Sequence, residues 1–179
     1  MQTFLPYPSF TESLSVLDNK RLGKQRVETH QILNVLLRRP KLDGTPYKGW
    51  LNHPCSVMWK DYVPALQLYF NTSLLEWVNR GFENNMSHEI INTDKIEYPG
   101  WFGFEDFHSS HRANLLKKDP EFYSQYGWTE NPEDPYVWMD KEKKWYKQYS
   151  GKTGRIYYAE VELQQKQNSA QTNKVLELG

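Results

Sequence analysis

The chain has 179 residues, enough for one domain with a sizeable hydrophobic core. Its 22 Lys and Arg residues balance its 22 Asp and Glu residues, so net charge indicates no partner. A single cysteine, Cys55, excludes an internal disulfide and a multi-cysteine metal site, and no apolar run approaches the roughly 18 residues of a membrane span. We therefore expect a soluble, intracellular protein with no membrane contact.

A long central helix is expected over residues 17–39, after an extended N-terminal segment that contains two prolines. Asp18 or Asn19 can cap its first turn, and Pro40 marks its end. Four polar side chains at helical spacing share one face of this helix: Arg21, Lys24, Gln25 and Glu28. Because the rest of the helix is largely apolar on two sides, it is expected to be central to the domain and to carry a candidate site.

Two further helices are expected after a loop at 41–53. The segment 52–80 predicts a helix that bends or restarts near Pro64 and is capped by Gly81. The next helix is expected from Phe107 or Ser109 to Lys118.

The remaining sequence, from residue 121 on, is aromatic, basic and rich in turns, and 156–161 is its best strand candidate. The predicted fold is mainly α: a compact single-domain helical bundle of about three main helices, with an irregular aromatic C-terminal region and room for a short β-hairpin. We expect one domain over residues 1–160 and a polar, frayed tail over 161–179.

Glu28 is the strongest candidate for a functional residue. One interpretation is structural: Glu28 lies one turn after Lys24 and can form an ion pair within the helix. The other is catalytic, since a carboxylate among phosphate-binding cations can act as a general acid or stabilise an oxocarbenium-like transition state at a glycosidic bond. Taken in isolation, the spacing favours the ion pair.

A second polar cluster lies on the third helix. His108 and His111 are spaced to share a metal, but no third ligand follows at a recognisable spacing, so we expect no metal site. Phosphate contacts are the more natural role for the basic groups of this segment, with a solvated helix end as the alternative: His111, Arg112, Lys117 and Lys118. No glycine-rich phosphate loop is present, so we expect no cofactor.

Three sequence blocks together resemble the pyrimidine-dimer DNA glycosylases of the phage and algal-virus endonuclease V type, and most closely their bacterial branch. The first is Leu17-x-Asn19-x-Arg21-Leu22 followed by Glu28, which falls on the family's catalytic glutamate. The second is Asp61 followed by Arg80-Gly81-Phe82, and the third is Pro120-x-Phe122-Tyr123-x-x-Tyr126-Gly127. Each block is moderately specific, and their order and spacing strengthen the resemblance.

The resemblance implies an N-glycosylase that acts on a damaged or modified pyrimidine in duplex DNA, foremost a pyrimidine dimer, with abasic-site lyase activity. In that mechanism an N-terminal amine attacks the sugar and a glutamate assists, which points to Met1 and Glu28 as catalytic residues. The DNA contacts would come from two helices: Arg21, Lys24, Gln25, Arg26, His111, Arg112, Lys117 and Lys118. The expected protein is a metal-independent monomer, cytoplasmic and nucleoid-associated, encoded by a bacterium, a phage or a virus.

The chain also departs from the viral pattern. Gln2 follows Met1 where the viral enzymes expose a threonine amine, and Val27 precedes Glu28 where they have an arginine. Three alternatives therefore stay open for the chemistry: the Met1 amine as nucleophile, a monofunctional glycosylase, or another reaction. A non-catalytic module that binds bent or damaged duplex is the principal alternative function, and a metal nuclease built on the two histidines is a weaker one.

Overall fold

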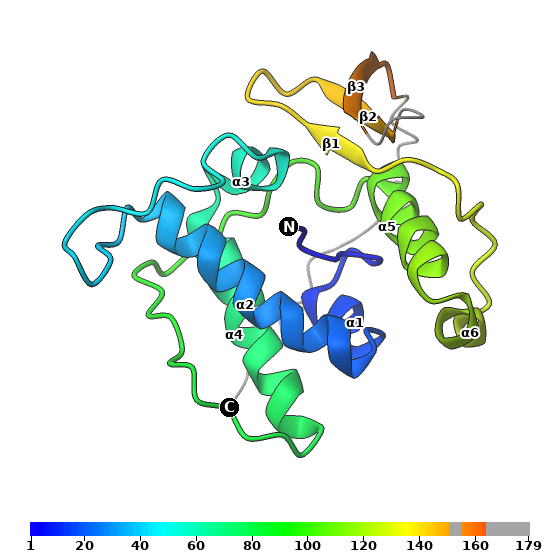
Figure 1. The fold of residues 1–179 in the computed structure, drawn as a ribbon. Coiled ribbons are helices and arrows are strands. Elements are labelled where there is room, and N and C mark those ends of the chain that lie inside the picture. Colours follow the sequence, from blue (N-terminus) through cyan, green and yellow to red (C-terminus); the bar gives the residue numbers. More distant parts are fainter. Residues whose placement is uncertain (151–154, 164–179) are drawn as a thin grey trace.

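The computed structural model describes residues 1–150 and 155–163 and confirms a mainly α fold with a small sheet (Figure 1). The helices are α1 (Phe10–Ser15), α2 (Asn19–Leu36), α3 (Pro54–Trp59), α4 (Val63–Asn79), α5 (Glu105–Lys118) and α6 (Pro120–Tyr123), followed by the 3-10 turn η1 (Ser124–Tyr126). The strands are β1 (Val137–Met139), β2 (Trp145–Ser150) and β3 (Ile156–Val161). The three longest helices, α2, α4 and α5, are the three main helices that the sequence predicts.

Helix α2 begins where the sequence predicts and ends earlier than expected. Asp18 is the N-cap, and its side chain accepts a hydrogen bond of 3.1 Å from the backbone N–H of Arg21. The helix ends at Leu36 rather than near Arg39, because Arg38 adopts a left-handed φ of 51° that no helix can continue through.

The segment 52–80 forms two separate helices rather than one bent helix. Pro54 opens α3 and Pro64 lies in the first turn of α4, positions where the missing proline N–H costs no hydrogen bond. Helix α5 starts at Glu105, slightly before the predicted Phe107, and ends at Lys118 as expected.

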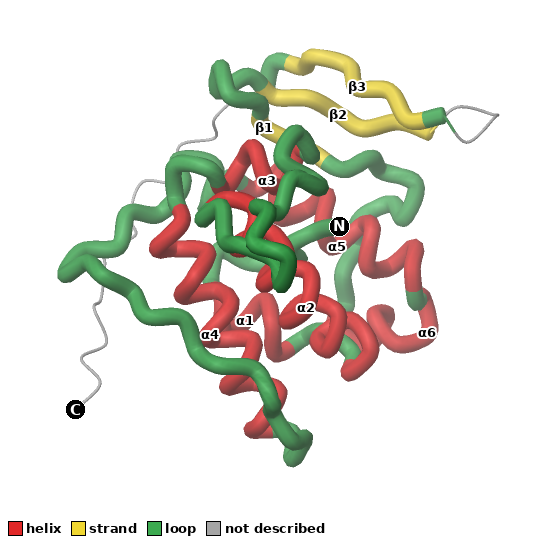
Figure 2. The backbone as a smooth tube through the Cα atoms, turned by 60° about the vertical axis from the view of Figure 1, so that its left-hand side comes forward, coloured by secondary structure: helices red, strands yellow, loops and turns green. Residues whose placement is uncertain are grey.

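The helices enclose an aromatic core, and the chain begins near its centre. Helix α2 packs along α4, and α1 packs on α4 as well. Fully buried aromatic side chains fill the interior, among them Trp59, Tyr69, Phe70 and Trp101. Figures 1 and 2 place the N-terminus between α2, α5 and the sheet rather than at the periphery. The core is therefore built around the first residues of the chain.

The sheet is antiparallel with the order β1-β2-β3 (Figure 2), and β3 is the strand predicted at 156–161. Trp138 of β1 is 4% exposed and ties the sheet to the core. The predicted frayed tail lies outside the described residues from 164 on, while Val161 belongs to β3. Within the part of the chain that the structure describes, no helix has the length and apolar character needed to span a membrane.

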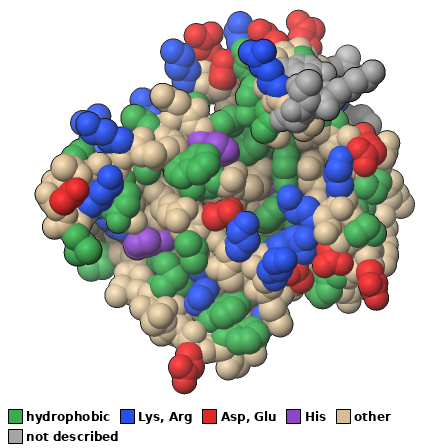
Figure 3. Space-filling view, viewed as in Figure 1, with side chains coloured by type: hydrophobic (Ala, Val, Ile, Leu, Met, Phe, Trp, Pro, Cys, Tyr) green, Lys and Arg blue, Asp and Glu red, His purple; other side chains and the backbone are tan. Residues whose placement is uncertain are grey.

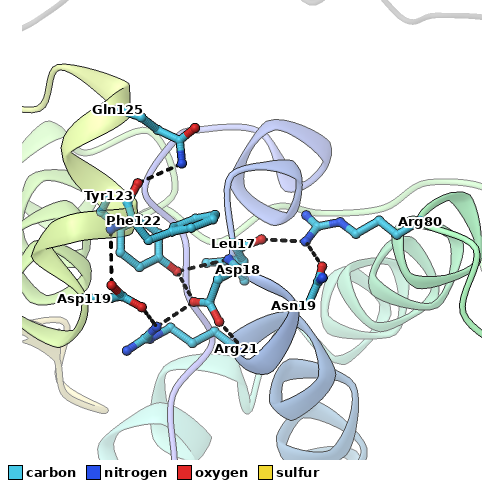
Figure 4. Close-up of polar contacts among 9 residues, drawn as sticks. All are labelled: Leu17, Asp18, Asn19, Arg21, Arg80, Asp119, Phe122, Tyr123 and Gln125. Atoms are coloured by element: carbon cyan, nitrogen blue, oxygen red, sulfur yellow. Dashed lines mark hydrogen bonds and ion pairs between the residues drawn. The ribbon is translucent and has the colours of Figure 1, made fainter.

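Residues from the three sequence blocks meet at the start of α2 (Figure 4). The Tyr123 hydroxyl donates a 2.7 Å hydrogen bond to the Asp18 carboxylate and accepts one of 3.2 Å from the Asp18 backbone N–H. Arg80 donates to the Leu17 carbonyl at 2.6 Å and to the Asn19 side chain at 3.0 Å. These block residues therefore fix the entry of the chain into α2, which carries Glu28.

Candidate active site

Buried side chains hold the N-terminal segment, residues 1–6, inside the fold. The Gln25 amide donates to the Gln2 carbonyl and accepts from the Phe4 backbone N–H, both at 2.8 Å. The Tyr69 hydroxyl lies 2.7 Å from the Gln25 side-chain oxygen and 2.9 Å from the Phe4 carbonyl. The segment thus runs along α2 as an extended chain whose backbone groups are satisfied by side chains.

Two histidines of α5 bind the backbone of Leu5, the residue that follows Phe4 in this segment. His111 Nδ1 accepts from the Leu5 backbone N–H at 3.0 Å, and His108 Nδ1 lies 2.7 Å from the Leu5 carbonyl. Since His108 Nε2 accepts from the Gly103 backbone N–H at 2.9 Å, its proton must be on Nδ1 and is donated to Leu5. Burial lowers the pKa of His108 to about 4 and also lowers that of His111, so both rings are neutral when they bind Leu5.

Three of the residues predicted to contact DNA have partners within the protein instead: Gln25, His111 and Arg112. The first two are fully buried. Arg112 donates to the Pro6 carbonyl at 2.7 Å and forms ion pairs with Glu105 and Glu130. All three bind the N-terminal segment, so their polar groups have partners within the protein.

Arg26, also predicted to contact DNA, packs against an aromatic ring. Its guanidinium stacks 4.1 Å from the centre of the Trp77 ring and donates to Asn84 at 3.2 Å. Desolvation on burial lowers the pKa of Arg26. This side chain therefore packs α2 against α4 and the segment after it.

Glu28 contacts the start of the chain directly. Its Oε2 accepts a hydrogen bond of 3.1 Å from the backbone N–H of Gln2, and its Oε1 lies 3.5 Å from the Lys24 ammonium. The side chain remains 19% exposed. Glu28 therefore makes the predicted ion pair within the helix and still faces a cavity, so the structural and the catalytic interpretations are compatible.

That cavity, the Glu28 pocket, has a volume of about 360 Å³ and contains both predicted catalytic residues, Glu28 and Met1. Burial and then the charge of the Met1 amine lower the pKa of His53, whereas Glu28 raises it, so His53 lies within electrostatic reach of both groups. The pocket is also lined by Gln2, Phe4, Lys20, Arg21, Lys24, Gln25, His53, Lys118, Tyr136, Trp138, Gln148, Ile156 and Tyr158.

The Glu28 pocket is rich in cations. Arg21 lies 2.6 Å from Asp18 and 3.4 Å from Asp119, which neutralise most of its charge. Lys20 and Lys118 line the pocket and form no ion pair with any described residue. Desolvation and then repulsion from Arg21 and Lys24 lower the pKa of Lys118, in line with its place in a cationic cluster. Figure 3 shows Lys and Arg side chains gathered near the centre of this face beside an acidic side chain.

Lys117 lies outside the pocket, although the sequence groups it with Lys118. Its ammonium is 2.7 Å from Glu133, and both side chains are exposed. The two neighbouring lysines of α5 therefore have different surroundings, and only Lys118 faces Glu28.

The two histidines of α5 are not available as metal ligands in this arrangement. Three of their four ring nitrogens are hydrogen-bonded to the backbone, and both rings are fully buried. Among residues 1–150 and 155–163, no three His, Cys, Asp or Glu side chains are grouped to hold a metal ion.

Sequence reasoning missed several residues of the pocket. Lys20 lies one turn before Lys24, so helical spacing would have found it. His53, Tyr136, Trp138 and Tyr158 come from a loop and from the C-terminal region, and no periodic pattern connects them with α2. The sheet wall of the pocket was visible only in the tertiary structure.

A comparison with protein families places this geometry in context. The family model for pyrimidine dimer DNA glycosylase matches residues 1–90, which include Met1, the cationic end of α2 and Glu28. Searches of curated proteins and of solved structures gave no match. Helix α5 and the sheet, which complete the pocket, lie beyond the matched residues. The match covers half of the chain, and the chain therefore belongs to the pyrimidine dimer DNA glycosylase family.

Proposed function

We propose that the chain is an N-glycosylase with abasic-site lyase activity that acts on a pyrimidine dimer or a related damaged pyrimidine in duplex DNA. The observation that carries the proposal is the hydrogen bond between Glu28 and the backbone N–H of Gln2 in a cationic pocket that Met1 also lines. This bond holds the residue next to the Met1 amine against the carboxylate. Family membership supplies the reaction class.

In the proposed mechanism the Met1 amine attacks C1′ of the deoxyribose, and the base leaves with the electrons of the glycosidic bond. The nitrogen gives up a proton, its lone pair forms the C1′=N bond as the C1′–O4′ bond breaks, and O4′ takes a proton to become a hydroxyl, which leaves a Schiff base at C1′. Removal of a proton from C2′ then drives cleavage of the C3′–O bond, and the strand breaks with the phosphate as leaving group. Glu28 stabilises the cationic sugar and takes part in the proton transfers.

The lysines of the pocket suit the phosphate backbone of the substrate. Lys20, Lys24 and Lys118 surround the carboxylate, and lysine is a common phosphate contact. We propose that Arg21 acts mainly by orienting this end of α2, since Asp18 and Asp119 bind its guanidinium.

We further propose that residues 1–160 form one functional domain that works as a monomer, in the bacterial branch of the family and with DNA in the cytoplasm as its substrate. The support is that the Glu28 pocket takes residues from Met1 to Tyr158 of a single chain. No second copy is needed to complete it.

A specific observation favours one alternative chemistry. The group bonded to Glu28 is the Gln2 amide, which is not a nucleophile, whereas the Met1 amine has no hydrogen bond to Glu28. A monofunctional glycosylase would use Glu28 to activate water instead. The two chemistries differ in their product, a nicked strand or an intact strand with an abasic site.

The test is the Glu28→Gln variant on a duplex with one thymine dimer. We expect base release to fall by about a hundred- to ten-thousandfold and strand nicking to disappear, while DNA affinity stays within about tenfold, near 1.4 kcal/mol. The control is Glu12→Gln, an exposed carboxylate on α1. Full activity of Glu28→Gln would refute the assignment, and binding by the wild-type protein with no product at any enzyme concentration would identify a DNA-binding module.

A further inference from the structure

Two polar groups of the Glu28 pocket form no hydrogen bond with any described residue. They are the side-chain NH2 group of Gln2 and the hydroxyl of Tyr136, and both atoms are buried. Buried polar atoms in proteins are nearly always hydrogen-bonded, so each exception calls for a reason. A few other described side chains share this property, but none of them lines the Glu28 pocket. A molecule bound in the pocket is therefore the natural partner of both groups.

The contacts of Gln2 fix the direction in which its side-chain NH2 group points. The side-chain oxygen accepts a hydrogen bond of 2.9 Å from the backbone N–H of Thr3. This bond assigns the oxygen to the Thr3 side of the amide, so the NH2 group lies on the other side. The backbone N–H of Gln2 donates to Glu28. Gln2 therefore brings two donors to the pocket, one bonded to the carboxylate and one without a partner.

Tyr136 directly precedes β1 and is held by contacts on its backbone and its ring. Its carbonyl accepts a hydrogen bond of 2.9 Å from the backbone N–H of Gln148 in β2. Its ring packs edge to face on His111, with 5.5 Å between centres, and lies 5.8 Å from the ring of Trp138. The hydroxyl is thus fixed in place by packing, without a hydrogen bond of its own.

The hydroxyl of Tyr136 lies within electrostatic reach of both Glu28 and Gln2. Burial and then the charge of Glu28 raise the pKa of Tyr136, while the side-chain amide of Gln2 lowers it. Because the net shift is upward, the hydroxyl stays protonated at neutral pH and can donate. Two neutral donors beside a carboxylate suit an oxygen that gains negative charge during the reaction.

We propose that Gln2 and Tyr136 are catalytic residues that bind O2 of the pyrimidine whose glycosidic bond is cleaved. This inference rests on the proposed glycosylase function and adds the leaving-group site to it. In a pyrimidine, O2 is attached to the carbon next to N1, so it enters the pocket together with C1′ wherever the rest of the base lies. Saturation of the ring in a dimer leaves this carbonyl group in place. Tyr136 lies beyond the residues that match the family.

The two donors act while the base departs. The C1′–N1 bond breaks and its electron pair moves to N1, which shares the negative charge with O2 through the carbon between them. Hydrogen bonds to O2 stabilise this charge in the transition state, as an oxyanion hole does. A proton that the attacking amine or water gives up then neutralises the base. The two groups therefore assist a Met1 nucleophile and an activated water alike.

Tyr136→Phe removes the hydroxyl and keeps the ring. We expect it to slow glycosidic-bond cleavage in a thymine-dimer duplex, measured as alkali-labile sites in a single turnover, by about a hundred- to a thousandfold. Affinity for the duplex should not change. Cleavage of a preformed abasic site, which has no O2, should not change either if the wild-type protein is a lyase. Tyr47→Phe, at an exposed position outside the pocket, is the matched control.

Stability separates this role from a structural one. The Tyr136 hydroxyl has no described partner to lose, so Tyr136→Phe should unfold at the same urea concentration as the wild-type protein or at a higher one. Tyr69→Phe is the contrasting variant, because the Tyr69 hydroxyl is bonded to Gln25 and to the Phe4 carbonyl. It should unfold at a lower concentration. A comparable loss of stability in Tyr136→Phe would identify a structural role and overturn the inference.

Gln2→Met tests the second donor, since methionine has a similar length, no side-chain N–H and the same backbone N–H for Glu28. We expect it to slow glycosidic-bond cleavage to a similar degree. Because both donors bind one oxygen, the double variant with Tyr136→Phe should lose less than the product of the two single losses. A loss equal to the full product would mean that the two groups bind different atoms, which contradicts the shared site.

The remaining outcomes separate the inference from the glycosylase function. Normal dimer cleavage by Tyr136→Phe would overturn the inference alone. An equal loss on dimer and abasic duplexes would assign the donors to the sugar, and a loss of affinity as large as the loss of cleavage would assign them to a phosphate. Either result overturns the inference and leaves the glycosylase intact. No glycosidic-bond cleavage by the wild-type protein would refute the proposed function, and the inference with it.

Discussion

The N-terminal segment and the three-stranded sheet line the same pocket by different physical means. Residues 1–6 are fixed by buried side chains that satisfy their backbone groups, as with Gln25 and His111. The sheet instead presents aromatic and partly exposed side chains, such as Tyr158, to the cavity. The first wall lies within the residues that match the family, and the second lies beyond them.

This difference suggests a division of labour. Chemistry at a glycosidic bond requires the amine and the carboxylate to be held in a narrow range of positions, and a buried hydrogen-bond network provides that rigidity. The partly exposed rings of the sheet need no such fixed position, so this wall can vary more freely in sequence. Substitutions that free the N-terminal segment should have the largest effects, and substitutions of the lysines that line the Glu28 pocket the smallest.

Gln25→Ala should have the largest effect on stability. Its amide serves the Gln2 carbonyl and the Phe4 backbone N–H, and both would lose their partner in the interior. We expect a loss of about 4 kcal/mol in the free energy of unfolding, measured by urea denaturation, and loss of strand cleavage. Gln31→Ala on the exposed side of α2 is the control and should unfold like the wild-type protein. Equal stability of the two variants would show that Gln25 does not stabilise the N-terminal segment.

Lower pH should reduce the stability of the fold around the N-terminal segment, because this segment is bound by the histidines of α5. His108 titrates near 6.5 when unfolded and at about 4 when folded, so the unfolded state binds more protons between these values. Stability from this group is therefore present above pH 6.5 and is lost as the pH falls towards 4, by about 3 kcal/mol. The pKa of His111 is shifted in the same direction.

Urea unfolding at several pH values measures this loss. His108→Gln cannot titrate and should show a flatter dependence of stability on pH, whereas His88→Gln, at an exposed position, should follow the wild-type curve. A steep curve that persists in His108→Gln would assign the loss to other groups.

The cationic rim should give the smallest effect. Lys118 faces the Glu28 pocket and Lys117 pairs with Glu133 outside it. We expect Lys118→Ala to weaken duplex binding about three- to tenfold and to lower the slope of log affinity against log salt by about one. Lys117→Ala should change neither quantity. If Lys117→Ala weakened duplex binding more than Lys118→Ala, the DNA would have to lie on another face of the protein.

The sequence predicted the local elements well because their signals are local. Asp18 caps α2 and Pro64 restarts the chain into α4, as expected from capping and proline chemistry. The early end of α2 was not predictable, because Arg38 gives no sign of a left-handed φ. Short strand β1 was missed for a related reason, since its three residues carry too little pattern.

The candidate site was predictable in part. Helical spacing brought Lys24 and Glu28 to one face, and the resemblance added Met1, which lines the same pocket. The same spacing cannot tell that Gln25 binds a buried chain segment, because a polar residue on a helix can bind such a segment as well as a phosphate. Whether such a residue binds a chain segment or a phosphate depends on the path of residues 1–6, which only the tertiary structure shows.

The most direct test of the proposed mechanism is sodium borohydride trapping of the purified protein on thymine-dimer and abasic duplexes, followed by mass mapping of the adduct. We expect a covalent adduct on the amine of Met1. With the dimer substrate, this adduct should not form in Glu28→Gln. The other amines of the pocket belong to Lys20, Lys24 and Lys118, and an adduct on any of them would contradict the assignment of the nucleophile. Abasic sites released without any adduct would contradict the lyase mechanism and leave a glycosylase that uses water.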